Sequence, residues 1–169
     1  MSERDEETDS PVTLQRAPIS LDYDYSAGQS ASRFLRGIQE GKLLGQRCPV
    51  DGRVYFPSRG SCPQHAVTFG DEVVELSDKG TIVTYSIVRV PSANIPLELP
   101  YIAVNVVLDG SDTILMHVLD GKPEDVHMGL RVQAVWKPKE EWTTSTANIM
   151  FFRANGEPDA DYDSYKEHI

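Results

Sequence analysis

The chain has 169 residues, of which 40% are hydrophobic and 25% charged, and its formal net charge is −10. This length is enough for one ordinary hydrophobic core and a small accompanying module. The charge is concentrated at the ends, because residues 1–10 and residues 154–169 each carry five acidic residues against one basic residue. The nearly neutral body argues against a surface that tracks nucleic-acid phosphates. No stretch has the ~20 apolar residues that a membrane span requires.

The N-terminal sequence MSERDEETDS is acidic, whereas a secretory signal begins with basic residues and continues with an apolar run. Two cysteines are too few for the disulfide framework of a secreted domain. We therefore expect a cytoplasmic protein. The acidic ends are expected to be solvated and disordered, and a clamp on a basic partner is the less favoured interpretation.

The first 27 residues show no sustained periodicity, and we expect an extended or disordered segment whose ordering would need a partner. A helix is predicted over residues 30–40, because Ala31, Phe34, Leu35 and Ile38 fall on one face of a 3.6-residue period. Ser30 is the predicted N-cap of this helix. Gly41 is predicted to be the glycine that follows its C-cap.

The rest of the chain is predicted to be mainly β. Residues 48–65 are too rich in glycine and proline for a regular core. An Asp-Gly-Ser-Asp turn at residues 109–112 indicates a hairpin. Five or six strands at short spacing, without a βαβ unit, predict a small antiparallel barrel, with one helical turn near residues 123–126. The predicted strands cover residues 42–47, 72–76, 81–90, 101–108, 113–119, 131–136 and 148–153.

Two pairs of candidate metal ligands lie within residues 48–65. Cys48-Pro-Val-Asp51 and Cys62-Pro-Gln-His65 each separate two donors by two residues, which is the spacing of paired zinc knuckles. Asp51 is the unusual member, because structural zinc is normally held by sulfur and nitrogen. A ribbon without metal, in which Asp51 only caps its turn, stays open beside the zinc site. A catalytic zinc with an open position is the least favoured reading, because the segment supplies no obvious acid–base group.

A series of short motifs runs in order through residues 33–153. They are Phe34-Leu-Arg-Gly-Ile, Gly41-Lys-Leu-Leu-Gly-Gln-Arg-Cys48, Tyr55-Phe-Pro57, Cys62-Pro, Gly80-Thr-Ile-Val-Thr-Tyr-Ser, Pro100-Tyr-Ile-Ala-Val-Asn-Val-Val-Leu-Asp and Pro123-Glu-Asp-Val-His-Met-Gly129. In this order they resemble the zinc-ribbon and OB-fold proteins associated with acyl-CoA metabolism, long catalogued as a domain of unknown function. The resemblance implies an N-terminal helix and a rubredoxin-like zinc ribbon, followed by a five- to six-stranded OB-fold barrel.

The resemblance also sets expectations for organisation and function. It implies a helix and ribbon over residues 28–70 and the barrel over 71–153, and composition adds a disordered or extended acidic tail over 1–27 and a second acidic tail over 154–169. The family pattern has four cysteines where this chain has Cys48, Asp51, Cys62 and His65, so zinc is expected with an altered ligand set. Family members act as partner subunits of thiolase-like, lipid-transfer-protein-like and hydratase-like enzymes. We therefore expect a non-catalytic scaffold in a hetero-oligomer of fatty-acid or sterol degradation, with a CoA thioester as a candidate ligand.

The segment between two predicted strands, residues 90–100, contains three prolines and several apolar side chains. In an OB-fold this is the first inter-strand loop, one of the two usual binding loops. Ile95, Leu97, Leu99 and the following Tyr101 are therefore candidate contacts for a partner or ligand. A lid formed when these apolar side chains fold back on the barrel is an equally weighted alternative.

Evidence for catalysis by the chain itself is thin. The sequence contains no G-x-S-x-G elbow and no phosphate-binding glycine loop. His117 is expected to be a core or edge histidine, and His127 an exposed turn residue. For Cys62, metal ligation is favoured over a role as a nucleophile. We predict a protein that is not an enzyme. The alternatives are a stand-alone OB-fold nucleic-acid binder and an acyl-CoA thioesterase or transferase in its own right.

Overall fold

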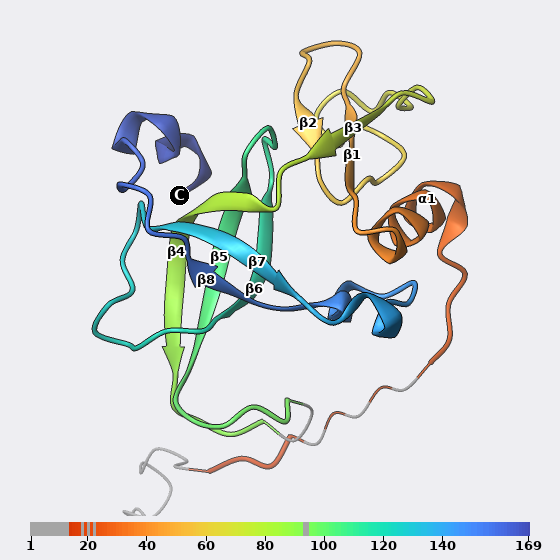
Figure 1. The fold of residues 1–169 in the computed structure, drawn as a ribbon. Coiled ribbons are helices and arrows are strands. Elements are labelled where there is room, and N and C mark those ends of the chain that lie inside the picture. Colours follow the sequence, from red (N-terminus) through yellow and green to blue (C-terminus); the bar gives the residue numbers. More distant parts are fainter. Residues whose placement is uncertain (1–13, 18, 20, 22, 93–94) are drawn as a thin grey trace, which may run out of the picture.

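In the computed structural model the described residues form a closed β-barrel, with a three-stranded sheet and one α-helix beside it (Figure 1). The structure describes residues 14–17, 19, 21, 23–92 and 95–169. Much of the predicted N-terminal tail lies outside the described residues, and its described part contains no helix or strand before Gly28. The elements are α1 (Gly28–Gln39), β1 (Leu43–Arg47), β2 (Val54–Tyr55), β3 (Val73–Leu76), β4 (Lys79–Val88), β5 (Tyr101–Leu108), β6 (Ile114–Leu119), β7 (Arg131–Trp136) and β8 (Ile149–Ala154).

The barrel consists of five strands in the closed order β4-β5-β6-β8-β7. Side chains of β5 alternate between outside and inside, which is why this strand could be predicted from its pattern. The predicted hairpin is present between β5 and β6. One strand pair departs from the predicted antiparallel arrangement, because β6 and β8 run parallel where Leu119 lies opposite Phe152. The arrangement is that of an OB-fold, so the predicted fold class is confirmed.

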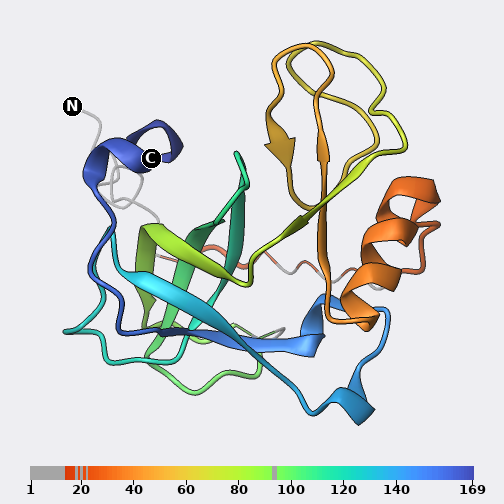
Figure 2. The same ribbon diagram turned by 45° about the horizontal axis from the view of Figure 1, so that its top comes forward.

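The second sheet has the order β2-β1-β3 and carries the turn-rich segment that follows β1. β3 pairs with β1 from Leu43 opposite Leu76 to Gln46 opposite Val73. β3 falls within the range predicted for the barrel, yet its hydrogen bonds join it to this ribbon sheet. It therefore connects the two modules before β4 enters the barrel. Figure 2 shows the ribbon loops extending away from the barrel.

The turn between β5 and β6 fastens the ribbon to the barrel. The backbone N–H of Val54 donates to the Asp112 carboxylate at 2.7 Å, and the Asp112 N–H donates to the Val54 carbonyl at 2.8 Å. The Thr113 hydroxyl accepts from the Phe56 N–H and donates to the Phe56 carbonyl, both at 2.8 Å. These bonds satisfy backbone groups of β2 and its continuation that the small sheet leaves unpaired.

Helix α1 packs through Phe34 and Ile38, as its periodicity predicts. The predicted N-cap is wrong, because the helix begins at Gly28 and Ser30 lies inside its first turn. The Ser30 hydroxyl lies against Gly60 of the ribbon. Its position therefore reflects tertiary packing and not helix capping. The C-terminal prediction is confirmed, because Gly41 follows the C-cap with φ of 77°.

The acidic C-terminal segment is largely exposed, but it is not the disordered tail that its composition predicts. Glu157 pairs with Lys79 at 2.5 Å and with Arg131 at 3.1 Å. Tyr165 is buried, with its ring and hydroxyl close to Gly129. The segment therefore packs on the barrel, because the Glu157 carboxylate meets cations of β4 and β7 and the Tyr165 ring fills a site beside Gly129.

The helical turn predicted near residues 123–126 is a single hydrogen-bonded turn, in which the Asp125 N–H donates to the Lys122 carbonyl at 3.0 Å. It does not extend to a helix in the described residues. None of the helices in the described part of the chain is long and apolar enough to cross a membrane.

Candidate metal centre

The first candidate ligand, Cys48, follows directly after β1 in a tight loop. Its backbone N–H donates to the Arg53 carbonyl at 2.8 Å, and its carbonyl accepts from the Gly52 N–H at 2.9 Å. Gly52 has φ of 77°, a conformation that glycine adopts without steric cost. The loop therefore closes on itself and presents the Cys48 side chain on its inner side.

The second loop repeats this backbone pattern around Cys62. The Cys62 N–H donates to the Val67 carbonyl at 2.8 Å, and its carbonyl accepts from the Ala66 N–H at 2.9 Å. Ala66 takes the place of Gly52 and also has positive φ, at 53°. The two loops are thus equivalent knuckles, as the paired ligand spacing predicts.

Three of the four predicted ligands come together between these knuckles. The Nδ1 atom of His65 lies 3.5 Å from the Cys48 sulfur and 3.4 Å from the Cys62 sulfur. All three ligand atoms lie within 4.8 Å of one another. Zinc bonds of about 2.3 Å to sulfur and about 2.0 Å to nitrogen, at tetrahedral angles, separate those atoms by about 3.5 Å. The cluster could therefore hold a metal ion with little rearrangement.

Asp51, the fourth predicted ligand, lies at the edge of this cluster. Its Oδ2 atom is 3.8 Å from His65 Nδ1, and its Oδ1 atom accepts from the Arg53 N–H at 3.1 Å. The carboxylate thus caps the first knuckle, which is the alternative role considered for it. Although burial opposes ionisation, the hydrogen bond with the Cys48 thiol lowers the pKa of Asp51. Its Oδ2 atom still faces the position that a fourth ligand would take.

The electrostatics of the cluster favour a thiolate at Cys62. Burial alone would disfavour the charged sulfur, but hydrogen bonds from the Tyr55 hydroxyl and from His65 lower the pKa of Cys62 to about 6. The same hydrogen bond to Cys62 raises the pKa of Tyr55 to about 12. Burial raises the pKa of Cys48, so the second thiol retains its proton unless a cation compensates the charge.

The combination of Cys62, His65 and Asp51 also has the composition of a nucleophilic triad, but its geometry is different. In a triad the base uses one ring nitrogen for the nucleophile and the other for the orienting acid. Here both sulfurs and the Asp51 carboxylate approach the same nitrogen, Nδ1. Both cysteines are only 1% exposed. Convergence on one point is the geometry of metal coordination.

The predicted contact loop presents its apolar side chains to solvent. Ile95, Leu97 and Leu99 are exposed, and Tyr101 is half-buried at the start of β5. The structure thus leaves these side chains accessible for a partner or ligand, and their role stays a prediction. Residues 93–94 of the same loop lie outside the described part of the chain.

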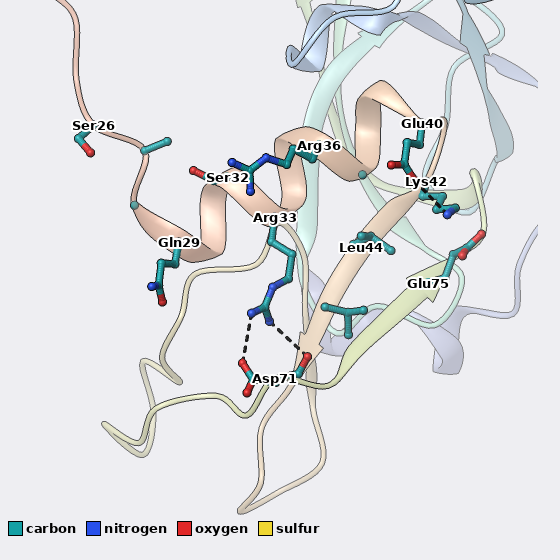
Figure 3. Close-up of a pocket in the computed structure, with 14 residues that line it drawn as sticks. Ser26, Gln29, Ser32, Arg33, Arg36, Glu40, Lys42, Leu44, Asp71 and Glu75 are labelled. Atoms are coloured by element: carbon teal, nitrogen blue, oxygen red, sulfur yellow. Dashed lines mark hydrogen bonds and ion pairs between the residues drawn. The ribbon is translucent and has the colours of Figure 1, made fainter.

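An open groove of about 920 Å³ lies beside α1, and the sequence does not predict it (Figure 3). Arg33, Arg36 and Lys42 line it, and three carboxylates accompany them. Arg33 pairs with Asp71 at 3.2 Å and Lys42 with Glu40 at 3.0 Å, so much of the charge is already compensated. The sequence signal that could have revealed this groove is the spacing of Arg33 and Arg36, which lie three residues apart and so on one face of α1. No histidine or cysteine is among the residues that line this groove.

Neither histidine of the barrel forms an acid–base pair in a cavity. His117 packs edge-on against Phe152 with ring centroids 5.5 Å apart, and burial lowers its pKa. His127 lies in an exposed turn, where a hydrogen bond with Asp159 at 2.9 Å raises its pKa. Both positions agree with the structural roles expected for them.

Sequence comparison connects this ribbon and barrel to known proteins. Residues 73–137 match the family model described as the C-terminal OB-fold domain of ChsH2. The chain is also 38% identical over 99 residues to a DUF35 domain-containing scaffold protein of Methanocaldococcus jannaschii, an alignment that covers 59% of this chain and 70% of the relative. Knuckles with sulfur and nitrogen donors followed by an OB-fold barrel define a ribbon-and-barrel class of protein. The chain belongs to the family of DUF35 domain-containing scaffold proteins, as the resemblance implies.

Two solved structures share the fold. A DUF35-family protein of unknown function from Sulfolobus solfataricus superimposes with a TM-score of 0.56 and 19% identity, over 75% of this chain and 84% of the other. A chain of the Ltp2–ChsH2(DUF35) aldolase superimposes with a TM-score of 0.57 and 21% identity, over 78% of this chain and 98% of the other. At these identities the likeness extends to the fold alone.

Proposed function

We propose that the chain is a non-catalytic scaffold subunit of a thiolase-type or lipid-transfer-type acyl-CoA enzyme in fatty-acid or sterol degradation. The observation that carries this proposal is its membership in a family whose M. jannaschii relative is named a scaffold protein. A fold neighbour that assembles as the Ltp2–ChsH2(DUF35) aldolase gives it further support. The geometry is compatible with this role, because Cys48, Cys62 and His65 converge as metal ligands and do not form a nucleophilic triad.

The metal centre has a structural role in this proposal. Cys48, Cys62 and His65 would hold zinc, with Asp51 or solvent in the fourth position. A bound zinc ion supplies cross-linking of the two knuckles, which stabilises a module too small for a full hydrophobic core. Because this role needs reduced thiols, we place the protein in the cytoplasm.

The loop at residues 90–100 would supply contacts to the partner. Its prolines restrict the unbound loop, so less conformational entropy is lost when Ile95, Leu97 and Leu99 become buried. Tyr101 at the base of the loop adds an aromatic contact of the kind enriched at interfaces. A CoA thioester held by the enzyme could lie against the same loop.

The proposal is tested by affinity purification of the tagged full-length chain from its native cytosol, followed by mass spectrometry. An acyl-CoA enzyme should be recovered in a fixed ratio to the chain and should stay with it through size-exclusion chromatography. A matched purification with the tag alone corrects for abundant proteins. Recovery of the chain without any acyl-CoA enzyme would contradict the proposal.

A further inference from the structure

The metal centre contains the only two cysteines of the chain, Cys48 and Cys62. Both are free thiols in the structure, and their sulfur atoms lie within 4.8 Å of each other. A disulfide bond is about 2.05 Å long, so the two sulfurs are near enough to be joined when their side chains turn toward each other. Any disulfide within one chain must therefore link these two residues.

The backbone of the two knuckles can stay in place while the sulfurs approach each other. The hydrogen bonds that close each knuckle join backbone N–H and carbonyl groups, and none of them uses a cysteine side chain. Rotation of the two side chains therefore leaves these bonds intact. The group beside both sulfurs is the His65 ring, whose Nδ1 atom lies 3.5 Å from Cys48 and 3.4 Å from Cys62. This ring reaches solvent and can swing outward.

The cluster is buried on one side and reaches solvent on the other. Each cysteine is only 1% exposed, and Tyr55 and Phe69 pack with the two cysteines in one buried group. The side chains of His65 and Asp51, in contrast, are 33% and 25% exposed. The approach open to a small oxidant is therefore along the side of the cluster that His65 covers.

A single disulfide would remove every sulfur ligand from this site. Sulfur binds a metal as a thiolate, and a sulfur held in a disulfide no longer carries that charge. A site built from four cysteines keeps two thiolates after one disulfide forms, whereas here only His65 and Asp51 would remain. Both side chains are partly exposed to water, and two such donors are fewer than a structural zinc site requires. Formation of the disulfide therefore releases the metal.

We propose that Cys48 and Cys62 form an oxidation site, at which a hydroperoxide converts the two thiolates to a disulfide and the ribbon releases its zinc. This inference rests on the zinc site of the proposed function and is independent of the scaffold role. The knuckles stay cross-linked in both states, by the metal when the thiols are reduced and by the disulfide when they are oxidised. Transient disulfides of this kind are typical of redox sensing in the cytosol.

The reaction balances with hydrogen peroxide as the two-electron oxidant. One sulfur attacks the peroxide, the O–O bond breaks, and the sulfur becomes a sulfenic acid while the leaving hydroxide takes a proton to form water. The second sulfur then attacks the sulfenic sulfur, so that the S–S bond forms, the S–O bond breaks and a second hydroxide leaves as water. Two thiolates, one peroxide and two protons from solvent thus give one disulfide and two water molecules.

The test treats the zinc-loaded full-length chain with hydrogen peroxide and follows two quantities over time. Released zinc is measured with a chromogenic chelator, and the disulfide by mass spectrometry of a tryptic digest prepared without reductant. Trypsin cleaves after Arg53 and Arg59, so the two cysteines fall in separate peptides, residues 48–53 and 60–79. These peptides should become covalently joined at the same rate as about one zinc per chain is released. Dithiothreitol followed by zinc should restore the loaded form.

Cys48→Ser is the matched control, because it leaves Cys62 without a partner sulfur. Peroxide should then give oxygen adducts of Cys62 and no joined peptides. The decisive measurement is made on the wild type, so it does not depend on the folding of the variant.

Three results on the zinc-loaded wild type would each overturn the inference: zinc retained with both thiols intact, sulfinic acids without joined peptides, or a disulfide that forms only between two chains. A chain that cannot be loaded with zinc would refute the zinc site itself, and the release of metal with it. The scaffold role is tested separately, by the affinity purification.

Discussion

Backbone geometry alone positions the sulfur atoms of Cys48 and Cys62 close to each other. Each knuckle closes with the same two backbone hydrogen bonds, so both side chains point to the space beside His65. Tyr55 and Phe69 pack around the cysteines with ring centroids 5.4 Å apart. This apolar shell shields the sulfurs from water, which strengthens the attraction of a thiolate for a cation.

At the residue scale, the zinc content of substituted chains should distinguish residues that bind the metal from residues that only lie next to it. Cys62→Ser should lose zinc, because a serine hydroxyl is a poor ligand, and the ribbon should become sensitive to proteolysis. Asp51→Asn is the matched variant, because its amide oxygen can still accept from the Arg53 N–H. It should retain about one zinc per chain by elemental analysis. Loss of zinc in Asp51→Asn would instead make the carboxylate a ligand, and absence of zinc from the wild type would mean an empty ribbon.

The sequence predicts where the candidate site lies better than how its residues divide their roles. The repeated ligand spacing identifies both knuckles, because that spacing and the turn residues are local properties. The capping role of Asp51 depends on the direction of its carboxylate toward Arg53, which spacing does not reveal. The Tyr55 hydroxyl, 3.5 Å from the Cys62 sulfur, reaches it only because β2 folds back beside β1.

At the scale of elements, the C-terminal segment is an ordered strap on the barrel. Its two short 3-10 turns, η4 (Tyr162–Ser164) and η5 (Lys166–His168), bracket the buried Tyr165. The Ala160 N–H donates to the Gly129 carbonyl at 2.9 Å, which fixes the strap to the connection between β6 and β7. The strap therefore contributes to the stability of the barrel.

Two tyrosines of the strap give a matched test of this contribution. Tyr165→Ala should lower the free energy of unfolding by about 2–4 kcal/mol, because it removes a buried ring. Tyr162→Ala should change it by less than about 1 kcal/mol, since that ring is 58% exposed. Chemical denaturation monitored by circular dichroism measures both. Equal effects of the two substitutions would show that the strap is not packed as described.

The ion pair between His127 and Asp159 makes the attachment of the strap depend on pH. The hydrogen bond with Asp159 raises the pKa of His127 in the folded state, so the stabilisation is fully present below the unfolded pKa of about 6.5. It is lost as pH rises through the raised folded-state value. The stability difference between wild type and Asp159→Asn should therefore be largest near pH 6 and shrink toward pH 8.5. A difference that stays constant over this range, in denaturation curves at each pH, would contradict the assigned pair.

Local sequence patterns predict helices and strands well where one face of the element is buried. They predict poorly those segments whose position depends on contacts with residues distant in the sequence. β5 and the buried face of α1 follow from alternation and helical periodicity. The strap could not be predicted, because its acidic composition indicates solvent exposure and its cationic partners Lys79 and Arg131 lie far away in the sequence. The pairing of β3 with β1 depends on similar long-range contacts.

At the scale of the whole molecule, the ribbon and barrel form one platform. Hydrogen bonds from Asp112 and Thr113 join the β5–β6 turn to the ribbon. The Asn148 side chain donates to the Ile38 carbonyl at 3.1 Å and joins the end of α1 to the start of β8. Such a platform can hold the exposed side chains of Ile95, Leu97 and Leu99 in place for one partner.

The central claim is that the chain supports an acyl-CoA enzyme without catalysing a reaction itself. Its most direct test measures release of CoA from acyl-CoA thioesters by the purified chain, by its partner enzyme, and by the two together. The account predicts no turnover by the chain alone, and an enzyme that is more active or longer-lived when the chain is present. Turnover by the chain alone that disappears in Cys62→Ser would contradict the account and identify the chain as a thioesterase or transferase.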